Sequence, residues 1–156
     1  MELRNGSRAL PGAALRRTAG RPRPLIRGAG GAKPEASAGP ALEEAKAAGL
    51  GVIVKEALAN GRLTARNNDP AFAARRRRLQ EEAARFGVSL DALALAAVLV
   101  RPWLDVVLSG AAAVDQLRSN LAALSVPWDQ RAGELARGLA ESPEDYWHTR
   151  ARLPWN

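Results

Sequence analysis

The sequence has no cysteine, one histidine and one tyrosine, so it is poor in the side chains that most often carry chemistry. Without cysteine, disulfides, cysteine-ligated zinc and thiol catalysis are excluded. His148 and Tyr146 leave few candidates for proton transfer. The carboxylates show no spacing typical of a catalytic or metal-binding set. We therefore assign no catalytic residue and no metal ligand from the sequence.

Long hydrophobic runs are also lacking. The longest, Ala92–Val100, is much shorter than the ~20 apolar residues that a transmembrane helix needs. The first 40 residues lack the apolar segment of a secretory signal, and their many Pro and Gly residues disfavour an amphipathic transit helix. We therefore expect a cytoplasmic protein.

Positive charge is concentrated at the start of the chain. Residues 1–40 hold eight basic and two acidic residues, whereas residues 41–156 hold fifteen and fourteen. With seven Gly, five Pro and few large apolar residues, the first segment predicts a disordered Arg/Gly/Pro-rich leader. Such a composition also arises when a GC-rich gene is read out of frame. A basic nucleic-acid-binding tail is an alternative, but no aromatic residues for base stacking interleave with the arginines.

From Ala41 onward the sequence has the order of an α/β fold. Ala41–Gly49 predicts the end of a helix that stops at Gly49, and the β-branched run Gly51–Val54 predicts a buried strand. The same order recurs in the apolar helix predicted over Leu90–Val100, capped by Ser89, and in the strand Val106–Leu108. Two such units in succession favour a parallel sheet within one domain, residues 41–156.

Another helix is predicted to start at Asp69 and to run to Gly87. It contains the basic run Arg75–Arg78, which is either a phosphate clamp or a solvated helix face. We prefer the solvated face, because Glu81 and Glu82 follow Arg77 and Arg78 at a spacing of four residues.

Two helices are predicted near the end of the chain, over Gln130–Ala140 and from Ser142 onward. The last one carries Tyr146, Trp147 and His148. We interpret its aromatic residues as covering a barrel or sheet rather than as an acid–base pair of Tyr146 with His148, because no carboxylate and nucleophile accompany them.

The segment Val106–Asn120 predicts a strand, a tight turn at Ser109 and Gly110, and a helix over Val114–Leu124 with an apolar stripe. The first amides of a helix have no partner within it, and its dipole is positive at that end. A helix entered through Gly and Ala is therefore a ready site for an anion, and a phosphate is the natural ligand.

Three segments together resemble the C-terminal third of the aldo/keto reductase family: Gly51–Thr64, Ser89–Leu95 and Val106–Asn120. The pieces Leu-x-Asn-Gly and Ser-Gly-Ala…Gln-x-x-x-Asn occur in the family's order and spacing. The resemblance covers about residues 41–156. It implies a C-terminal part of a (β/α)8 TIM barrel, an α/β fold whose seventh and eighth strands are Gly51–Val54 and Val106–Leu108. The barrel would be incomplete in this chain.

The resemblance also implies a site for a nicotinamide cofactor, NAD(P)(H), and a small carbonyl or alcohol substrate. In the family, the residues of the first loop lie over the pyrophosphate, those of the second surround the adenosine phosphate and ribose, and two on the following helix flank the adenine. The residues at these positions are Leu58 and Asn60, then Ser109, Gly110 and Ala111, then Gln116 and Asn120.

Two departures from the family pattern change the expected function. NADPH-preferring members place cations near the positions of Gly110 and Gln116, and both are missing here, which favours NAD over NADP. The family's catalytic Asp, Tyr, Lys and His have no counterpart in residues 1–40, and Tyr146 lies in the wrong element. We therefore expect an inactive, truncated fragment of an NAD(P)-dependent oxidoreductase. The alternative is a non-catalytic helical module with a basic nucleic-acid-binding tail.

Overall fold

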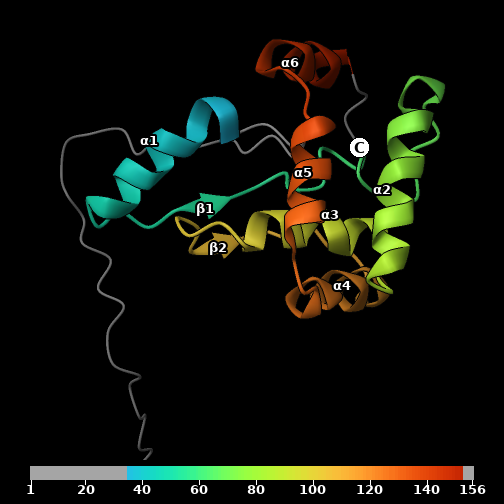
Figure 1. Cartoon of the computed structure of the whole chain (residues 1–156), viewed down its shortest axis with the longest axis horizontal. Helices are drawn as coiled ribbons and strands as arrows, with labels where there is room; N and C mark the ends of the chain where they lie inside the picture. Colours follow the sequence, from blue (N-terminus) through green and yellow to red (C-terminus); the bar gives the residue numbers. More distant parts are fainter. Residues whose placement is uncertain (1–34, 153–156) are drawn as a thin grey trace, which may run out of the picture.

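The computed structural model describes residues 35–152. The leader expected to be disordered lies mostly outside these residues. The described part is rich in helices, with an early strand and a central strand among them (Figure 1). In chain order the elements are α1 (Glu35–Ala47), β1 (Ile53–Val54), the 3-10 helix η1 (Pro70–Phe72), α2 (Ala73–Arg85), α3 (Leu90–Leu99), β2 (Val106–Val107), α4 (Val114–Leu121), the 3-10 helix η2 (Ala122–Ser125), α5 (Gln130–Gly138) and α6 (Pro143–Arg152).

The two strands pair in parallel, as the repeated helix–strand order predicted. Ile53 lies opposite Val106, and Val54 lies opposite Val107. The pairing continues beyond the strands, because the Leu108 amide donates to the Val54 carbonyl over 2.9 Å. Within residues 35–152 the sheet has these two strands and forms no closed barrel.

Helix α1 begins on the leader side of residue 40, which is the expected boundary between the leader and the domain. It begins at Glu35 and contains Pro40, which removes a backbone donor from the helix interior. Leu42 anchors the helix, because its side chain is buried in one cluster with Val52 and with Val54 of β1.

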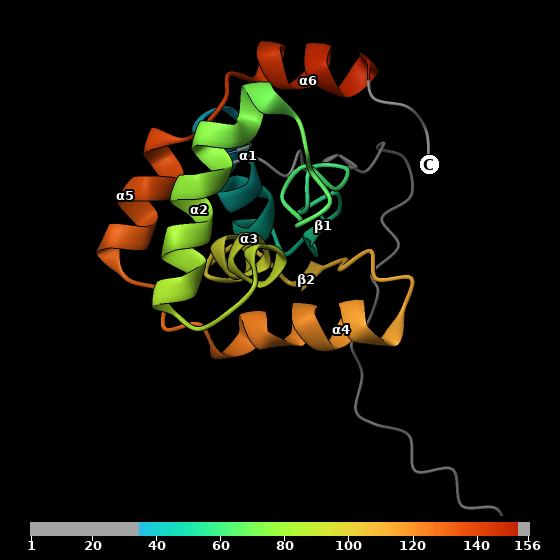
Figure 2. The same ribbon diagram turned by 90° about the vertical axis from the view of Figure 1, so that its right-hand side faces the viewer.

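Helix α3 is the centre of the packing, as its apolar sequence predicted. Ala92, Leu95 and Ala96 are buried together with Ala57 and Ala123. Figure 2 shows α3 among α2, α4 and the sheet, and its residues contact all three of these neighbours. The predicted cap is confirmed, since the Ser89 hydroxyl accepts a hydrogen bond from the Ala92 amide.

The predicted cap at Asp69 is confirmed too, although the helix that follows starts as the 3-10 helix η1. The pairing predicted on α2 is correct only in part. Arg77 lies 3.9 Å from Glu81, but Glu82 is buried and pairs with Arg85 and Arg131 instead of Arg78. A buried carboxylate requires close partners, and Arg131 of α5 supplies one that the local spacing does not reveal.

The apolar stripe of α4 does not lie in the core, contrary to the sequence interpretation. Its side chains are exposed, as are those of Ile53, Val106 and Leu108 on one face of the sheet. Helix α4 is instead anchored by Asn120, which is buried, and by Ala123 of η2. In a closed barrel, alternate strand residues point into a packed interior. No element of residues 35–152 covers these surfaces. The exposed residues of the stripe are Val114, Leu117, Leu121 and Leu124.

Candidate functional site

Two loops leave the sheet at the same edge, because β1 and β2 run in parallel and in register. We call residues 55–69 the β1 loop and residues 108–113 the β2 loop. They begin next to each other, since Val54 and Leu108 share a backbone hydrogen bond. The carboxyl ends of parallel strands are where α/β proteins bind ligands. This edge is therefore the candidate functional site.

The β2 loop is held by two amide side chains of α4. The Asn120 side chain donates to the Ser109 carbonyl over 3.3 Å, and the Gln116 side chain accepts from the Ala112 amide over 2.8 Å. The Ser109 hydroxyl accepts a longer bond, 3.4 Å, from the Ala111 amide. The five residues predicted in this part of the chain are thus brought together around one turn.

Gly110 gives this turn its shape. Its φ of 67° lies in the left-handed region, which a side chain disfavours. A Cβ built on Gly110 would meet no atom within 4 Å, so the space beside the backbone is open. A ligand can therefore approach the main chain closely at this position.

The start of α4 carries unused hydrogen-bonding capacity. Its N-cap residue, Ala113, has no side chain that can accept from the first amides. The positive end of the helix dipole adds to the attraction for an anion. Asp115 stands in the same turn and is paired with Arg118 at 3.4 Å on the surface. Arg118 is thus engaged with a carboxylate of its own helix.

Asn120 has one polar atom without a partner among the described residues. The residue is buried, its nitrogen is used by Ser109, and its Oδ1 atom accepts no hydrogen bond. Gln116 is exposed but turned back toward Ala112. Both side chains lie on the loop side of α4, one helical turn apart. Their predicted place beside an adenine remains a prediction.

In the β1 loop, the predicted residues Leu58 and Asn60 play different structural parts. Leu58 packs its side chain against the cluster around Leu95. Its carbonyl accepts hydrogen bonds from the Gly61 and Leu63 amides, at 3.0 and 3.2 Å. Asn60 has a φ of 55°, a conformation that Asn tolerates better than most residues. The loop can thus offer a ligand its backbone and Asn60, but not the Leu58 side chain.

The β1 loop concentrates unusual backbone conformations. Glu56, Ala59 and Asn60 are the described non-glycine residues with positive φ, and Gly61 follows with a φ of 84°. For an ordinary side chain this conformation costs roughly 1–2 kcal/mol. Such strain persists only where surrounding contacts hold the chain.

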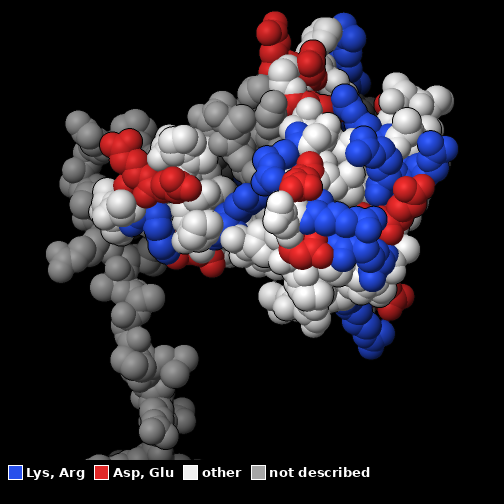
Figure 3. Space-filling model, viewed as in Figure 1, with Lys and Arg blue, Asp and Glu red and all other residues white. Residues whose placement is uncertain are grey.

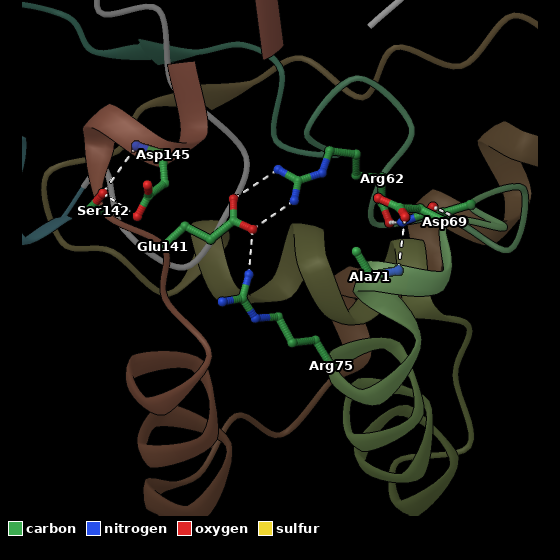
Figure 4. Close-up of polar contacts among 8 residues, drawn as sticks. Arg62, Asp69, Ala71, Arg75, Glu141, Ser142 and Asp145 are labelled. Atoms are coloured by element: carbon green, nitrogen blue, oxygen red, sulfur yellow. Dashed lines mark hydrogen bonds and ion pairs between the residues drawn. The ribbon is translucent and has the colours of Figure 1, made fainter. Parts of the chain in front are cut away.

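A cluster of charged side chains holds this loop. Arg62 binds both carboxylate oxygens of Glu141, at 2.8 and 2.6 Å, and Arg75 of α2 binds the same carboxylate at 2.5 Å (Figure 4). We call Arg62, Arg75 and Glu141 the Glu141 cluster. The Arg62 guanidinium holds the pKa of Glu141 below its usual value, and Glu141 raises the pKa of Arg62. The cluster therefore stays ionised near neutral pH.

Helix α6 covers the same loop. Arg150 lies 3.4 Å from Glu56. The covering interpretation is confirmed for Tyr146, which is buried at 3% exposure, and is wrong for Trp147, which is exposed. The Tyr146 hydroxyl has no hydrogen-bond partner among the described residues, and burial raises its pKa to about 12. His148 is exposed on the same helix. The two side chains therefore do not form an acid–base pair.

Sequence reasoning did not single out Glu56, Arg62, Glu141 or Arg150. Glu141 precedes the last helix, and 79 residues separate it from Arg62. No local pattern links residues so far apart. The structure adds two negative findings for residues 35–152: no cluster of His, Asp or Glu is suited to a metal ion, and no helix is long and apolar enough to cross a membrane.

Comparison with known proteins identifies the family. A sequence model of the aldo/keto reductase family matches residues 39–137, more than half of the chain. The chain belongs to the aldo/keto reductase family. The resemblance found in the sequence is thus confirmed for the C-terminal part, and the family supports an oxidoreductase-like function. No curated protein matches the chain.

Proposed function

We propose that residues 35–152 form the adenosine-phosphate side of a nicotinamide cofactor site, in an NAD(P)-dependent oxidoreductase that acts on carbonyl or alcohol groups. In this proposal β1 and β2 are the seventh and eighth strands of a (β/α)8 barrel. The nicotinamide ring would supply the hydride. Membership of the aldo/keto reductase family supports the class of reaction.

The observation that carries the proposal is the shared edge of the two loops. Open space beside Gly110 lies next to the start of α4, whose N-cap residue Ala113 offers no side-chain acceptor. A phosphate placed there would accept from the free amides of the first turn. These residues fit a phosphorylated adenosine.

The second part of the proposal concerns the choice of dinucleotide. The 2′-phosphate of NADP is recognised best by arginine or lysine. Gly110 and Gln116 offer no charge, and Arg118 is paired with Asp115. The exposed carboxylate of Asp115 would repel a second phosphate in the first turn of α4. We therefore propose that the site favours NAD over NADP.

A titration of the full-length chain tests both parts. Adenosine 5′-diphosphate and adenosine 2′,5′-diphosphate represent the two cofactors at this end of the site, and calorimetry measures their affinities. We expect binding of the first and no preference for the second. A hundredfold preference for the 2′,5′-diphosphate would overturn the choice of NAD. Absence of binding by either nucleotide would overturn the site itself.

A variant sharpens the titration. Gln116→Arg places a cation where NADPH-preferring relatives have one, so we expect about a tenfold gain for the 2′,5′-diphosphate. Gln130→Arg adds the same charge on α5, where Gln130 is exposed and bonded to Glu134. This control corrects for the change in net charge, and an equal gain in both variants would contradict the assignment of Gln116.

We infer further that Tyr146 contributes to the fold of this site and does not serve it as a proton donor. Tyr146 is their one tyrosine, and its buried hydroxyl has a pKa of about 12. Its ionisation near neutral pH is therefore negligible. We expect Tyr146→Phe to leave nucleotide affinity unchanged, and a change above threefold would contradict this inference.

The nucleic-acid alternative receives no support from the described residues. It depends on the basic leader, which lies mostly outside them. On the face drawn in Figure 3, basic side chains over α2 and α5 are interspersed with acidic ones. The ion pairs of Arg85 with Glu82 and Asp129 belong to this mixed surface. A surface of alternating sign does not form the continuous basic stripe that nucleic acid requires.

A further inference from the structure

We propose that Glu141 is a positioning residue for the cofactor site: by binding Arg62 and Arg75, it holds the strained β1 loop in the conformation that presents Asn60 at the strand edge. The inference rests on the proposed function and deepens it. It extends the site to the segment between α5 and α6, which is far from Asn60 in the sequence.

Backbone strain in the β1 loop is concentrated in one run of three residues. Ala59, Asn60 and Gly61 are consecutive residues in the left-handed region. Short runs of this kind relax to other conformations unless their ends are fixed. Turn hydrogen bonds, such as that from the Arg62 amide to the Ala59 carbonyl at 3.2 Å, define the shape but do not tie it to the rest of the fold.

The strained run is flanked by two residues that are fixed to the rest of the fold, Leu58 and Arg62. On one side of the strained run, Leu58 packs into the core, which fixes the chain by apolar contact. On the other side, Arg62 follows Gly61 directly and is fixed by Glu141. Ala59 is itself buried and belongs to this apolar anchor, so Asn60 and Gly61 are the strained residues that lie between an apolar anchor and an ionic one. Loss of the ionic anchor would free the run at its C-terminal end.

The ion pair of Arg62 with Glu141 is partly shielded from water and well oriented. The side chains of Arg62 and Glu141 are 11% and 13% exposed, so water screens their attraction little. The guanidinium binds both oxygens in a fork, which fixes its orientation as well as its distance. Arg75 joins α2 to the same carboxylate, as Figure 4 shows. Glu141 thus connects the β1 loop with α2.

Hydrogen exchange of the full-length chain without nucleotide tests the positioning step. In Glu141→Gln, we expect the amides of residues 59–63 to exchange at least about tenfold faster than in the parent, because the loop opens locally. The amides of the β2 loop should not change. Glu134→Gln is the matched control, since Glu134 is an exposed carboxylate of α5. Unchanged exchange in Glu141→Gln would overturn the proposal.

Nucleotide affinity tests the link to function. We expect Glu141→Gln to weaken the binding of ADP-ribose about tenfold, and Glu141→Asp, which keeps the charge, to recover part of this loss. If Glu141→Gln melts at a much lower temperature, Arg75→Gln replaces it, because it removes one partner of Glu141 and leaves the Arg62 fork in place. We expect a smaller effect of the same sign from that variant.

The two experiments separate the possible failures. Faster loop exchange with unchanged ADP-ribose affinity would overturn the positioning role while leaving the cofactor site intact. Failure of the parent chain to bind ADP-ribose would overturn the proposed function, and the positioning role with it. The exchange data would still report whether Glu141 holds the loop.

Discussion

The β1 and β2 loops start side by side, yet the structure holds them by different means. The β1 loop depends on charged side chains from distant parts of the chain, Glu141 above all. The β2 loop depends on Gln116 and Asn120, amide side chains of the helix that follows it. One loop is thus fixed by tertiary structure and ionic contacts, and the other by local, uncharged contacts.

This difference has consequences for how each loop responds to its surroundings. Ionic contacts weaken when a partner is protonated, whereas amide hydrogen bonds do not titrate. Contacts between distant residues are lost whenever the intervening elements separate, whereas those within one turn and helix survive partial opening. Loss of a support that both loops share should therefore abolish the difference between them, whereas a change at one loop should leave the other as it is.

The largest effect should come from removing the support that both loops share. Leu95 is buried at 2% exposure in the cluster that contacts Leu58 and Val107. We expect Leu95→Ala to lower the free energy of unfolding by ~2–5 kcal/mol and to open both loops together, because a cavity forms beneath them. Urea unfolding measures the first effect and hydrogen exchange the second.

Leu124→Ala is the matched control for Leu95→Ala, because it makes the same change of side chain at an exposed position and creates no cavity. Leu124 is exposed at the end of the α4 stripe, and we expect a change within about 0.5 kcal/mol. A loss as large as that of Leu95→Ala would mean that the stripe is covered in solution.

Acid should separate the two loops. Glu141 has a native pKa below its ordinary value of 4.5, so its contribution to stability is complete above about pH 4.5 and is lost as the pH falls through the native pKa. Charged hydrogen bonds of this kind contribute about 1.5–3 kcal/mol. We expect protection of the β1 loop to be lower at pH 3 than at pH 5, by no more than about this free energy, while protection of the β2 loop stays constant.

Glu141→Gln provides the comparison for the acid experiment. In this variant, protection of the β1 loop should be low at both pH values. If the variant keeps the acid dependence of the parent, a different carboxylate controls the loop.

The contrast between the loops also explains what the sequence could predict. The residues around the β2 loop were identified from the resemblance to the aldo/keto reductase family, which is visible because Ser109, Gly110, Gln116 and Asn120 are close in the chain and form a local pattern. The caps at Asp69 and Ser89 were also predicted from local patterns. Parallel pairing followed from the order of helices and strands.

The Glu141 cluster was not predicted, because its members come from three separated segments. A charged residue looks alike in the sequence whether it faces solvent or a buried partner. Glu82 shows this plainly: spacing assigned it to Arg78, whereas α5 brings Arg131 to it. The exposed stripe of α4 is the opposite case, where periodicity marked a buried face that no described element covers.

A smaller effect confined to the β2 loop is expected from Gly110→Ala. The left-handed conformation costs ~1–2 kcal/mol for alanine, and no atom lies close enough to add a steric term. We expect urea unfolding to show this decrease in the free energy of unfolding, and hydrogen exchange to become faster in the amides of residues 110–113. Gly110→Asn should lose less, because Asn tolerates positive φ. Faster exchange in the β1 loop would show that the loops are coupled.

The smallest effect should come from Gln116→Ala, which removes the acceptor of the Ala112 amide. The bond is exposed, so we expect the free energy of unfolding to fall by about 0.5–1 kcal/mol and the opening to be limited to the β2 loop.

Gln116→Glu restores the acceptor and places a negative charge at the positive end of α4, so its stability should equal or exceed that of the parent. The same charge would compete with a phosphate, so its affinity for adenosine 5′-diphosphate should fall. Calorimetry on both variants thus separates holding the loop from binding the nucleotide, and equal affinities in parent and Gln116→Glu would place the phosphate away from α4.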